Sequence, residues 1–250
     1  MNDVLILRGP HFSAEIDRSE WRREAVGLKA VGLVQLPVTW TLPFMVITTA
    51  AFNRWKETSL KAELRNSLTI GLAPIIGHEP GRLIVRSSAS AENIDCRGWL
   101  ESVRCTATED DVLDTADRVW ARAKGTPRVA EKGFGLVVQQ FKIPKLHGHL
   151  SNERRVSGKR DVWLCEVETP MAGAEAKAIR FLAKIPRRKV DTPPLLCSTQ
   201  EQLIQRLKEV ARWCVVGKER NHLEWVWDGE RVWIVQRDVE EEIRGKRPAC

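Results

Sequence analysis

The stretch His222-Leu-Glu-Trp-Val-Trp-Asp-Gly-Glu-Arg-Val-Trp-Ile-Val-Gln-Arg237 predicts a β-hairpin near the end of the chain. Two runs rich in Val, Ile and Trp flank Asp228-Gly229, and Asp-Gly in such a setting is the strongest short-range signal for a hairpin turn. Glu224 and Gln236 interrupt the apolar runs, one on each strand. A carboxylate and an amide on paired strands can hold a metal ion and a polar ligand. The alternative is a plain sheet with two solvated side chains.

The composition of the chain bounds its class. Of its 250 residues, 43% are hydrophobic and 29% are charged, which is typical of a globular protein with a hydrophobic core. The length suits one large domain or two small ones. A net charge of +7 and a pI near 9.3 favour acidic partners, nucleotides and nucleic acids among them. An inert basic surface fits equally well, because only Arg187-Arg188-Lys189 forms a dense basic cluster.

The cysteines and the apolar runs indicate the cellular compartment in which we expect the protein. None of the six cysteines stands in a C-x-x-C pattern, which argues against zinc. We find no secretory signal at the start, and no apolar run approaches the roughly 20 residues that a spanning helix needs. We therefore expect a cytoplasmic protein with reduced thiols and no membrane partner.

The order of predicted elements indicates an α+β protein with two subdomains. Helices and strands alternate first, strands then dominate, and a helix and the hairpin follow, with the division near residues 125–133. Expected helices cover 20–36 with Ser19 as N-cap, a stretch from near Ala50, 59–68, 110–124 and 199–216. Expected strands cover 4–8, 44–48, 82–86, 135–141, 146–150 and 161–168, with 178–185 as strand or helix and 87–98 as a loop.

Two motifs suit phosphate binding. Gly27-Leu-Lys29, with Gly32 after it, lies in a helical pattern in which glycine permits close approach and Lys29 supplies a point charge. Val85-Arg-Ser-Ser-Ala-Ser-Ala-Glu-Asn93 places Arg86 at the end of a strand, with Ser87 and Ser88 beside it. A guanidinium fork, hydroxyls and backbone N–H groups together form a phosphate cradle. The alternatives are a surface lysine on a helix and an arginine paired with a carboxylate.

A third motif, Val137-Val-Gln-Gln-Phe141, places Gln139 where its amide can meet the edge of a base, although an ordinary interior strand explains the pattern as well. His147 and His149 alternate and so share one face of a strand. No third ligand accompanies them, which favours a plain surface. The sequence contains no P-loop and no G-x-G-x-x-G pattern.

The order and spacing of these motifs resemble the N-terminal nucleotide-binding domain of the phosphoenolpyruvate synthase and pyruvate phosphate dikinase family, to which rifampicin phosphotransferase also belongs. That family carries G-G-K-x-x-x-L on a helix, then P-x-x-F-V-I-T-T, V-R-S-S-A-x-x-E-D, V-V-Q and a hairpin reading E-W…L-x-Q-x-R. The matching segments here are Gly27 to Leu33, Pro43 to Thr49, Val85 to Asn93, Val137 to Gln139, and Glu224-Trp225 through Gln236.

The resemblance implies an ATP-grasp-like fold, in which two subdomains with mixed or antiparallel sheets enclose ATP and Mg²⁺. The expected domains are 1–128 and 129–240, followed by a charged tail, 241–250. By matching position, Lys29 and Arg86 would contact phosphates and serve catalysis, with Ser87 and Ser88 adjoining, and Gln139 would lie near the adenine. Glu224 and Gln236 would hold the metal. The chemistry would be phosphoryl transfer, which rests on positioning and charge neutralisation, to a histidine on another domain or protein.

The chain also departs from the family pattern. Leu28 replaces the second glycine, Asn93 replaces an acidic residue, residues 96–99 differ from S-F-A-G-Q, and Asp238 stands where the hairpin's last arginine belongs. These changes keep open a second hypothesis, a catalytically degenerate nucleotide-sensing or interaction module of the same fold. A basic nucleic-acid-binding protein is the weakest hypothesis, because it rests on charge alone.

Overall fold

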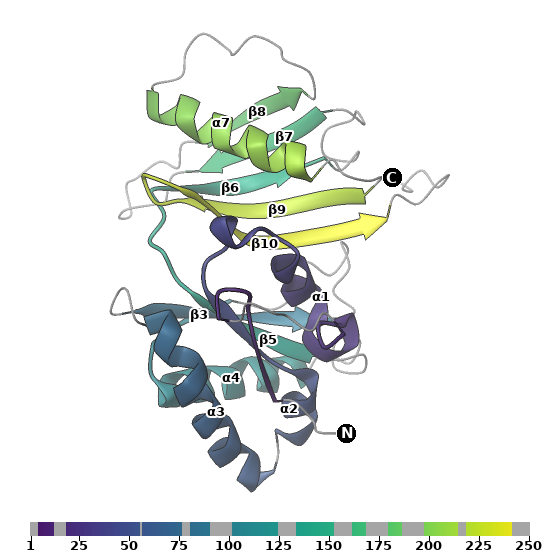
Figure 1. Ribbon diagram of the computed structural model, residues 1–250, viewed down its shortest axis with the longest axis vertical. Coiled ribbons are helices and arrows are strands. Elements are labelled where there is room, and N and C mark those ends of the chain that lie inside the picture. Colours follow the sequence, from purple (N-terminus) through teal and green to yellow (C-terminus); the bar gives the residue numbers. More distant parts are fainter. Residues whose placement is uncertain are drawn as a thin grey trace. The chain divides into compact units, whose positions relative to one another are not determined.

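The structure is a computed structural model. It describes residues 5–12, 19–55, 57–76, 81–90, 102–124, 134–152, 162–168, 180–186, 198–214 and 219–241. The chain forms two compact units, Met1–Lys142 and Ile143–Cys250, and each contains its own sheet (Figure 1). The division falls later than the predicted boundary between 128 and 129, because the strand Phe134–Gln140 lies at the centre of the first sheet.

The first unit is built on an antiparallel sheet of five strands in the order β1-β2-β5-β3-β4. The strands are β1 (Ile6–Arg8), β2 (Phe44–Ile47), β3 (Arg82–Ala89), β4 (Val103–Thr106) and β5 (Phe134–Gln140). The helices are α1 (Arg23–Val34), α2 (Thr49–Arg54), α3 (Thr58–Ile76) and α4 (Glu109–Lys124), with a 3-10 turn at Val38–Trp40. Every residue of β5 is buried, as expected of a central strand covered on both faces.

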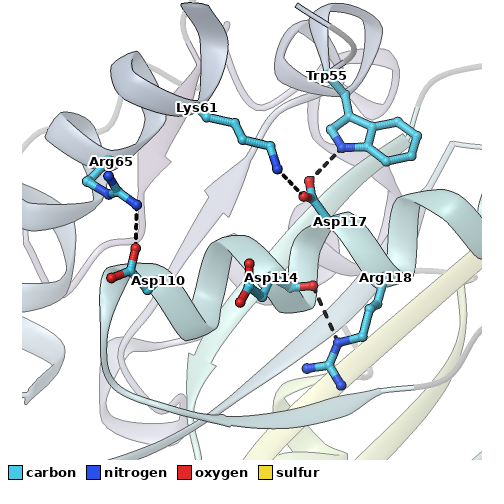
Figure 2. Close-up of polar contacts among 7 residues, drawn as sticks. All are labelled: Trp55, Lys61, Arg65, Asp110, Asp114, Asp117 and Arg118. Atoms are coloured by element: carbon cyan, nitrogen blue, oxygen red, sulfur yellow. Dashed lines mark hydrogen bonds and ion pairs between the residues drawn. The ribbon is translucent and has the colours of Figure 1, made fainter. Parts of the chain in front are cut away.

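One face of this sheet contributes to a core that also contains apolar residues of α3 and α4. It includes Leu64, Leu68, Val85, Trp120 and Leu136. Polar contacts join the two helices at their outer side: Lys61 Nζ lies 2.5 Å from Asp117 Oδ2, and Arg65 pairs with Asp110 (Figure 2). Three of these side chains are exposed and Asp117 is partly exposed, so the pairs contribute little to stability, and the apolar contacts between the helices and the sheet dominate.

The second unit is an antiparallel sheet in the order β10-β9-β6-β7-β8, with one helix. Its elements are β6 (Leu146–Ser151), β7 (Val162–Glu168), β8 (Arg180–Pro186), α7 (Ser198–Trp213), β9 (Glu219–Trp227) and β10 (Val232–Glu241). Figure 1 shows α7 crossing one face of the sheet. That face carries Leu150, Cys165, Leu223, Trp225 and Ile234, all buried. The other face carries the polar members of the alternating strands.

Most sequence expectations agree with these elements. The fold class, α+β with antiparallel sheets in two units, is confirmed. In the stretch 178–185, which we expected as strand or helix, the described residues from Arg180 onward belong to strand β8, and the predicted hairpin forms. Cys105, Cys165 and Cys214 are free thiols. In the part of the chain that the structure describes, no helix is long and apolar enough to cross a membrane.

Three local expectations were wrong. Helix α1 begins at Arg23 after Arg22 as N-cap, not after Ser19. Helix α3 continues to Ile76 rather than ending near Leu68. Strand β3 continues through Ser87, Ser88 and Ala89, which we expected in a loop, because all three pair with β5. Backbone pairing with a neighbouring strand therefore outweighs the weak strand propensity of serine and alanine.

Candidate functional site

Helix α1, which carries Lys29, is interrupted at Gly27, and it contacts β3 close to this break. Gly27 has φ 78° and ψ 170°, so α1 consists of two helical segments that meet there. A Cβ atom at this position would lie 1.8 Å from the backbone oxygen of Ser88, so only glycine fits. Just after the break, the Ala30 backbone N–H donates to Ser88 Oγ over 3.2 Å. The serine hydroxyl thus satisfies a donor near the start of the second segment, as an N-cap residue does within a helix.

Strand alternation sorts the predicted residues of the first unit between two faces of the sheet. Arg86 shares a face of β3 with Ser88, which contacts α1. Gln139 is on the same side, since it pairs with Ile84 while Arg86 pairs with Val137. Figure 1 shows α1 next to β3 and β5. The structure therefore brings Arg86, Ser88 and Gln139 together on the α1 side of the sheet.

The prediction for Ser87 was wrong, because its side chain does not lie on the same face of the sheet as Arg86 and Ser88. It lies between Arg86 and Ser88 on β3, so its side chain is on the opposite face, with the core residues Val85 and Ala89. It is buried, and within the described residues its Oγ atom has no hydrogen-bond partner. We predicted Ser87 and Ser88 as one cradle in a loop. As strand residues their hydroxyls point in opposite directions.

The basic residues of the set are buried. Lys29 and Arg86 are each 7% exposed, which is rare for either residue type unless its charge is compensated. Lys29 lies on α1 directly before Ala30, whose N–H binds Ser88. The helix that carries the lysine is therefore fixed to the strand that carries the arginine.

Gln139 carries a buried side-chain amide in the first unit. Its side chain is completely buried on the central strand. Neither its Nε2 nor its Oε1 atom has a hydrogen-bond partner in the described part of the chain. A buried polar group left without a partner costs about 1–3 kcal/mol, and such exceptions in a native fold call for an explanation.

The second unit arranges its predicted residues in one row across the sheet. Gln236 on β10 is opposite Glu224 on β9, Glu224 is opposite His149 on β6, and His149 is opposite Glu166 on β7. Directly opposite residues on antiparallel strands point to the same side of the sheet. His222 belongs to this polar face too, and its Nε2 lies 3.2 Å from Nδ1 of His149.

A β-bulge creates this row. Ile234 is opposite Trp225, but the register shifts before Gln236, which is opposite Glu224. Without the shift, Gln236 would share the face of Ile234, because residues two apart on a strand point the same way. The extra residue, Val235, therefore turns Gln236 to the polar face. Bulges commonly redirect a side chain in this manner.

Asp238 and Arg237 occupy opposite faces beyond the bulge. Gln236 Nε2 donates to both carboxylate oxygens of Asp238, over 3.2 and 3.0 Å. Arg237 is 5% exposed, donates from Nε to Asn221 Oδ1 over 3.0 Å, and stacks over Trp213 at 5.2 Å. Arg237 is thus bound on the side of α7 and does not replace the arginine that is missing at position 238.

The polar row across the second sheet could supply only some of the ligands that Mg²⁺ needs. No group of three or more His, Cys, Asp or Glu residues that could hold a metal ion occurs among the described residues. Mg²⁺ is commonly held by one or two carboxylates, with waters and phosphate oxygens completing the octahedron. Glu224 with Gln236 fits that pattern. Cys165 does not contribute, because it lies on the other face of β7 and burial raises its pKa to about 12.

Sequence reasoning missed two polar contacts on this face of the sheet and left other predictions untested. It did not identify the Asp238 contact or the His222–His149 pair. Counting every second residue from Glu224 would have placed His222 on the same face. Asn93 and residues 96–99, where the sequence departs from the family pattern, lie outside the described residues.

No family model matches the chain, and no curated protein matches it significantly. Solved structures similar to it include D-alanyl-alanine synthetase A from Vibrio cholerae, at 15% identity and TM-score 0.35, covering 79% of this chain and 49% of that one. D-alanine-D-alanine ligase from Helicobacter pylori is 13% identical in sequence, with a TM-score of 0.38, and the match covers 79% of this chain and 48% of that one. D-alanine-D-alanine ligase from Bacillus anthracis, complexed with ATP, is 10% identical in sequence, with a TM-score of 0.28, and the match covers 72% of this chain and 56% of that one.

This chain thus spans about half the length of the structures that it resembles. At these TM-scores the similarity assigns no activity to the chain.

Proposed function

We propose that the chain is an ATP·Mg-binding domain of the ATP-grasp-like type found in phosphoenolpyruvate synthase and pyruvate phosphate dikinase. The observation that carries the proposal is the buried amide of Gln139, on the same face of the sheet as Arg86 and next to α1. The edge of a purine offers both donors and acceptors, so a bound base would satisfy both ends of this amide. In the resembling family, the same position lies near the adenine.

Lys29 and Arg86 are the proposed phosphate contacts. They are cations on two elements that the Ala30–Ser88 hydrogen bond holds together. Ser88 contributes by fixing α1, and Ser87 is left out of the set because it is on the core face. In the second unit, Glu224 and Gln236 would hold Mg²⁺, which when bound neutralises developing charge on the transferred phosphoryl group.

The proposed reaction is transfer of phosphate from ATP to a histidine on another domain or protein. A second candidate, a nucleotide-sensing module without catalysis, is favoured by one observation. Asp238 brings a negative charge to the place where the family pattern has an arginine, and it binds Gln236. Phosphoryl transfer needs positive charge around the phosphates, so this substitution lowers catalysis more than it lowers binding.

Calorimetry with ATP and Mg²⁺ tests the proposal. Lys29→Ala and Arg86→Ala should each weaken ATP binding about tenfold or more, because a charged hydrogen bond contributes about 1.5–3 kcal/mol. Ser87→Ala is the matched control: it removes a hydroxyl from the adjacent position on the opposite face and should leave the affinity unchanged. Circular dichroism would verify that each variant is folded.

The outcomes separate the hypotheses. If the wild-type chain does not bind ATP in the presence of Mg²⁺, both nucleotide hypotheses fail. If ATP binds but neither hydrolysis nor labelling of added histidine-bearing partners occurs, the sensing module is favoured. Salt-dependent binding to nucleic acid without ATP binding would support the third hypothesis.

A further inference from the structure

The positions next to the side-chain amide of Gln139 on the first sheet are apolar. Directly opposite Gln139 are Phe44 on β2 and Ile84 on β3, and Val137 precedes it by two residues on the same face. None of these three side chains can donate or accept a hydrogen bond. Arg86 is a diagonal neighbour, for which about 7–8 Å is typical, yet neither end of the amide has a hydrogen-bond partner in the described part of the chain. No hydrogen bond among the described residues therefore holds this amide in one orientation.

A glutamine amide without such a bond can present either of its ends to a ligand. Its nitrogen donates and its oxygen accepts, and the last torsion of the glutamine side chain is roughly two-fold. A half turn about that torsion therefore exchanges the donor and the acceptor. By contrast, an amide that is held by a neighbouring polar group offers a ligand one fixed pattern.

Purine bases fall into two classes that match these two orientations. A 6-aminopurine such as adenine has an N–H donor at its amino group next to the accepting N1, whereas a 6-oxopurine has an accepting O6 next to an N1–H donor. A site rejects one of these classes only if its own polar groups are fixed, so that the wrong base leaves them unpaired. The amide of Gln139 does not meet this condition, because it can turn to pair with either class.

We propose that the nucleotide site accepts both 6-aminopurine and 6-oxopurine triphosphates, and that Gln139 turns its amide to suit the base. This inference rests on the proposed function, because it names the bases that the proposed ATP site takes. Lys29 and Arg86 would serve the phosphates of both nucleotides alike. The choice between the two bases then depends on Gln139 alone among the proposed contacts.

The test is calorimetry on the full chain with Mg²⁺, comparing ATP with inosine triphosphate, whose base is a 6-oxopurine. Gln139→Leu removes both ends of the amide and keeps a side chain of similar size. Gln140→Leu is the matched control, because Gln140 is the next residue of β5, is 8% exposed, and lies on the opposite face, where it pairs with Leu83. Proton magnetic resonance detects the N1–H of bound inosine triphosphate when an acceptor protects it from exchange.

The wild-type chain should bind the two nucleotides with affinities within about tenfold of each other, because each base gains two hydrogen bonds from the amide. Gln139→Leu should weaken both affinities by about tenfold or more, since either base is then left with two unpaired groups. The protected N1–H signal should disappear in this variant. Gln140→Leu should bind both nucleotides as the wild type does. Thermal unfolding should show that Gln139→Leu is folded, because it removes a buried amide that has no partner.

Two results would overturn the inference and leave nucleotide binding standing. One is a preference of the wild-type chain for either nucleotide by more than about tenfold, which indicates a fixed amide. The other is a Gln139→Leu variant with unchanged affinities, which means that Gln139 does not contact the base. If neither nucleotide binds to the wild-type chain, the proposed function itself fails, and the inference fails with it.

Discussion

Adjacent residues of β10 have opposite roles because the strand turns them to opposite faces. Gln236 is on the polar row with Glu224, whereas Arg237 is packed among Asn221 and Trp213. Asn221 also donates from Nδ2 to the Cys214 backbone oxygen over 3.4 Å. The arginine therefore belongs to a buried network that ties the hairpin to the end of α7.

We predict that Arg237→Ala lowers the free energy of unfolding by about 2–4 kcal/mol, because it removes a buried charged hydrogen bond and a cation–π contact. Gln236→Ala should change stability by much less and instead weaken metal-dependent ATP binding. Urea unfolding and calorimetry on both variants test this. If Arg237→Ala weakens ATP binding while leaving stability intact, the assignment of the two faces is wrong.

At the scale of the element, the start of α4 shows how local capping defines a boundary. Thr108 Oγ1 accepts from the Asp111 backbone N–H over 3.3 Å. The Asp111 carboxylate accepts from the Thr106 N–H and hydroxyl, over 2.6 and 2.7 Å. These hydrogen bonds to Thr106 hold the pKa of Asp111 below its usual value. The cap joins β4 to α4, and the amphipathic pattern of α4 places Val112, Ala116, Val119 and Trp120 in the core.

A lowered folded-state pKa sets the direction of the pH dependence. The contribution of Asp111 is fully present above its unfolded pKa of about 3.9 and is lost as the pH falls through the lower folded value. We predict that Asp111→Asn is less stable than the wild type at neutral pH and that the difference shrinks below about pH 4. Unfolding curves from pH 7 to pH 2.5 measure it.

Asp114→Asn serves as the control for Asp111. It removes the same charge from the same helix, but the contact of Asp114 shown in Figure 2 is made by its backbone oxygen with Arg118, over 3.4 Å. Its effect should be smaller. A stability difference for Asp111→Asn that persists unchanged in acid would contradict the role of the ionised carboxylate.

At the scale of the whole molecule, each unit has a sheet and a set of buried residues of its own. In the first unit, the close approach of Gly27 to Ser88 fixes α1 on the sheet. Gly135 does the same on β5, where a Cβ would lie 2.9 Å from the Val26 backbone oxygen. Two glycines therefore permit the packing on which the proposed phosphate contacts depend.

We predict that Gly27→Ala lowers the stability of the first unit by about 2 kcal/mol or more, because the backbone conformation is strained for alanine and its Cβ overlaps Ser88. Amide hydrogen exchange in β3 and β5 should accelerate more than about tenfold. Amides of β6 and β9 should keep their protection. Equal acceleration in both sets would mean that the chain unfolds as one cooperative body.

Much of the fold could be read from local patterns. The hairpin, the buried strand Phe44–Ile47 and the amphipathic helix α4 each follow from a period of two or of about 3.6 residues, with turn and cap residues at their ends. The candidate residues Lys29, Arg86, Gln139, Glu224 and Gln236 were also found by sequence, because their residue types and their order matched a family pattern. Their roles remain predictions for the experiments above.

The hairpin of residues 222–237 shows what local sequence patterns cannot predict. Its sequence by itself determined two strands and a turn, because β-branched and aromatic residues around Asp-Gly favour that local structure. Only the tertiary structure decided which way Gln236 and Arg237 point, since the bulge at Val235 depends on register with β9. In the same way, pairing with β5 decided that Ser87 and Ser88 are strand residues on opposite faces. Register is a property of two segments together, so no single stretch of sequence contains it.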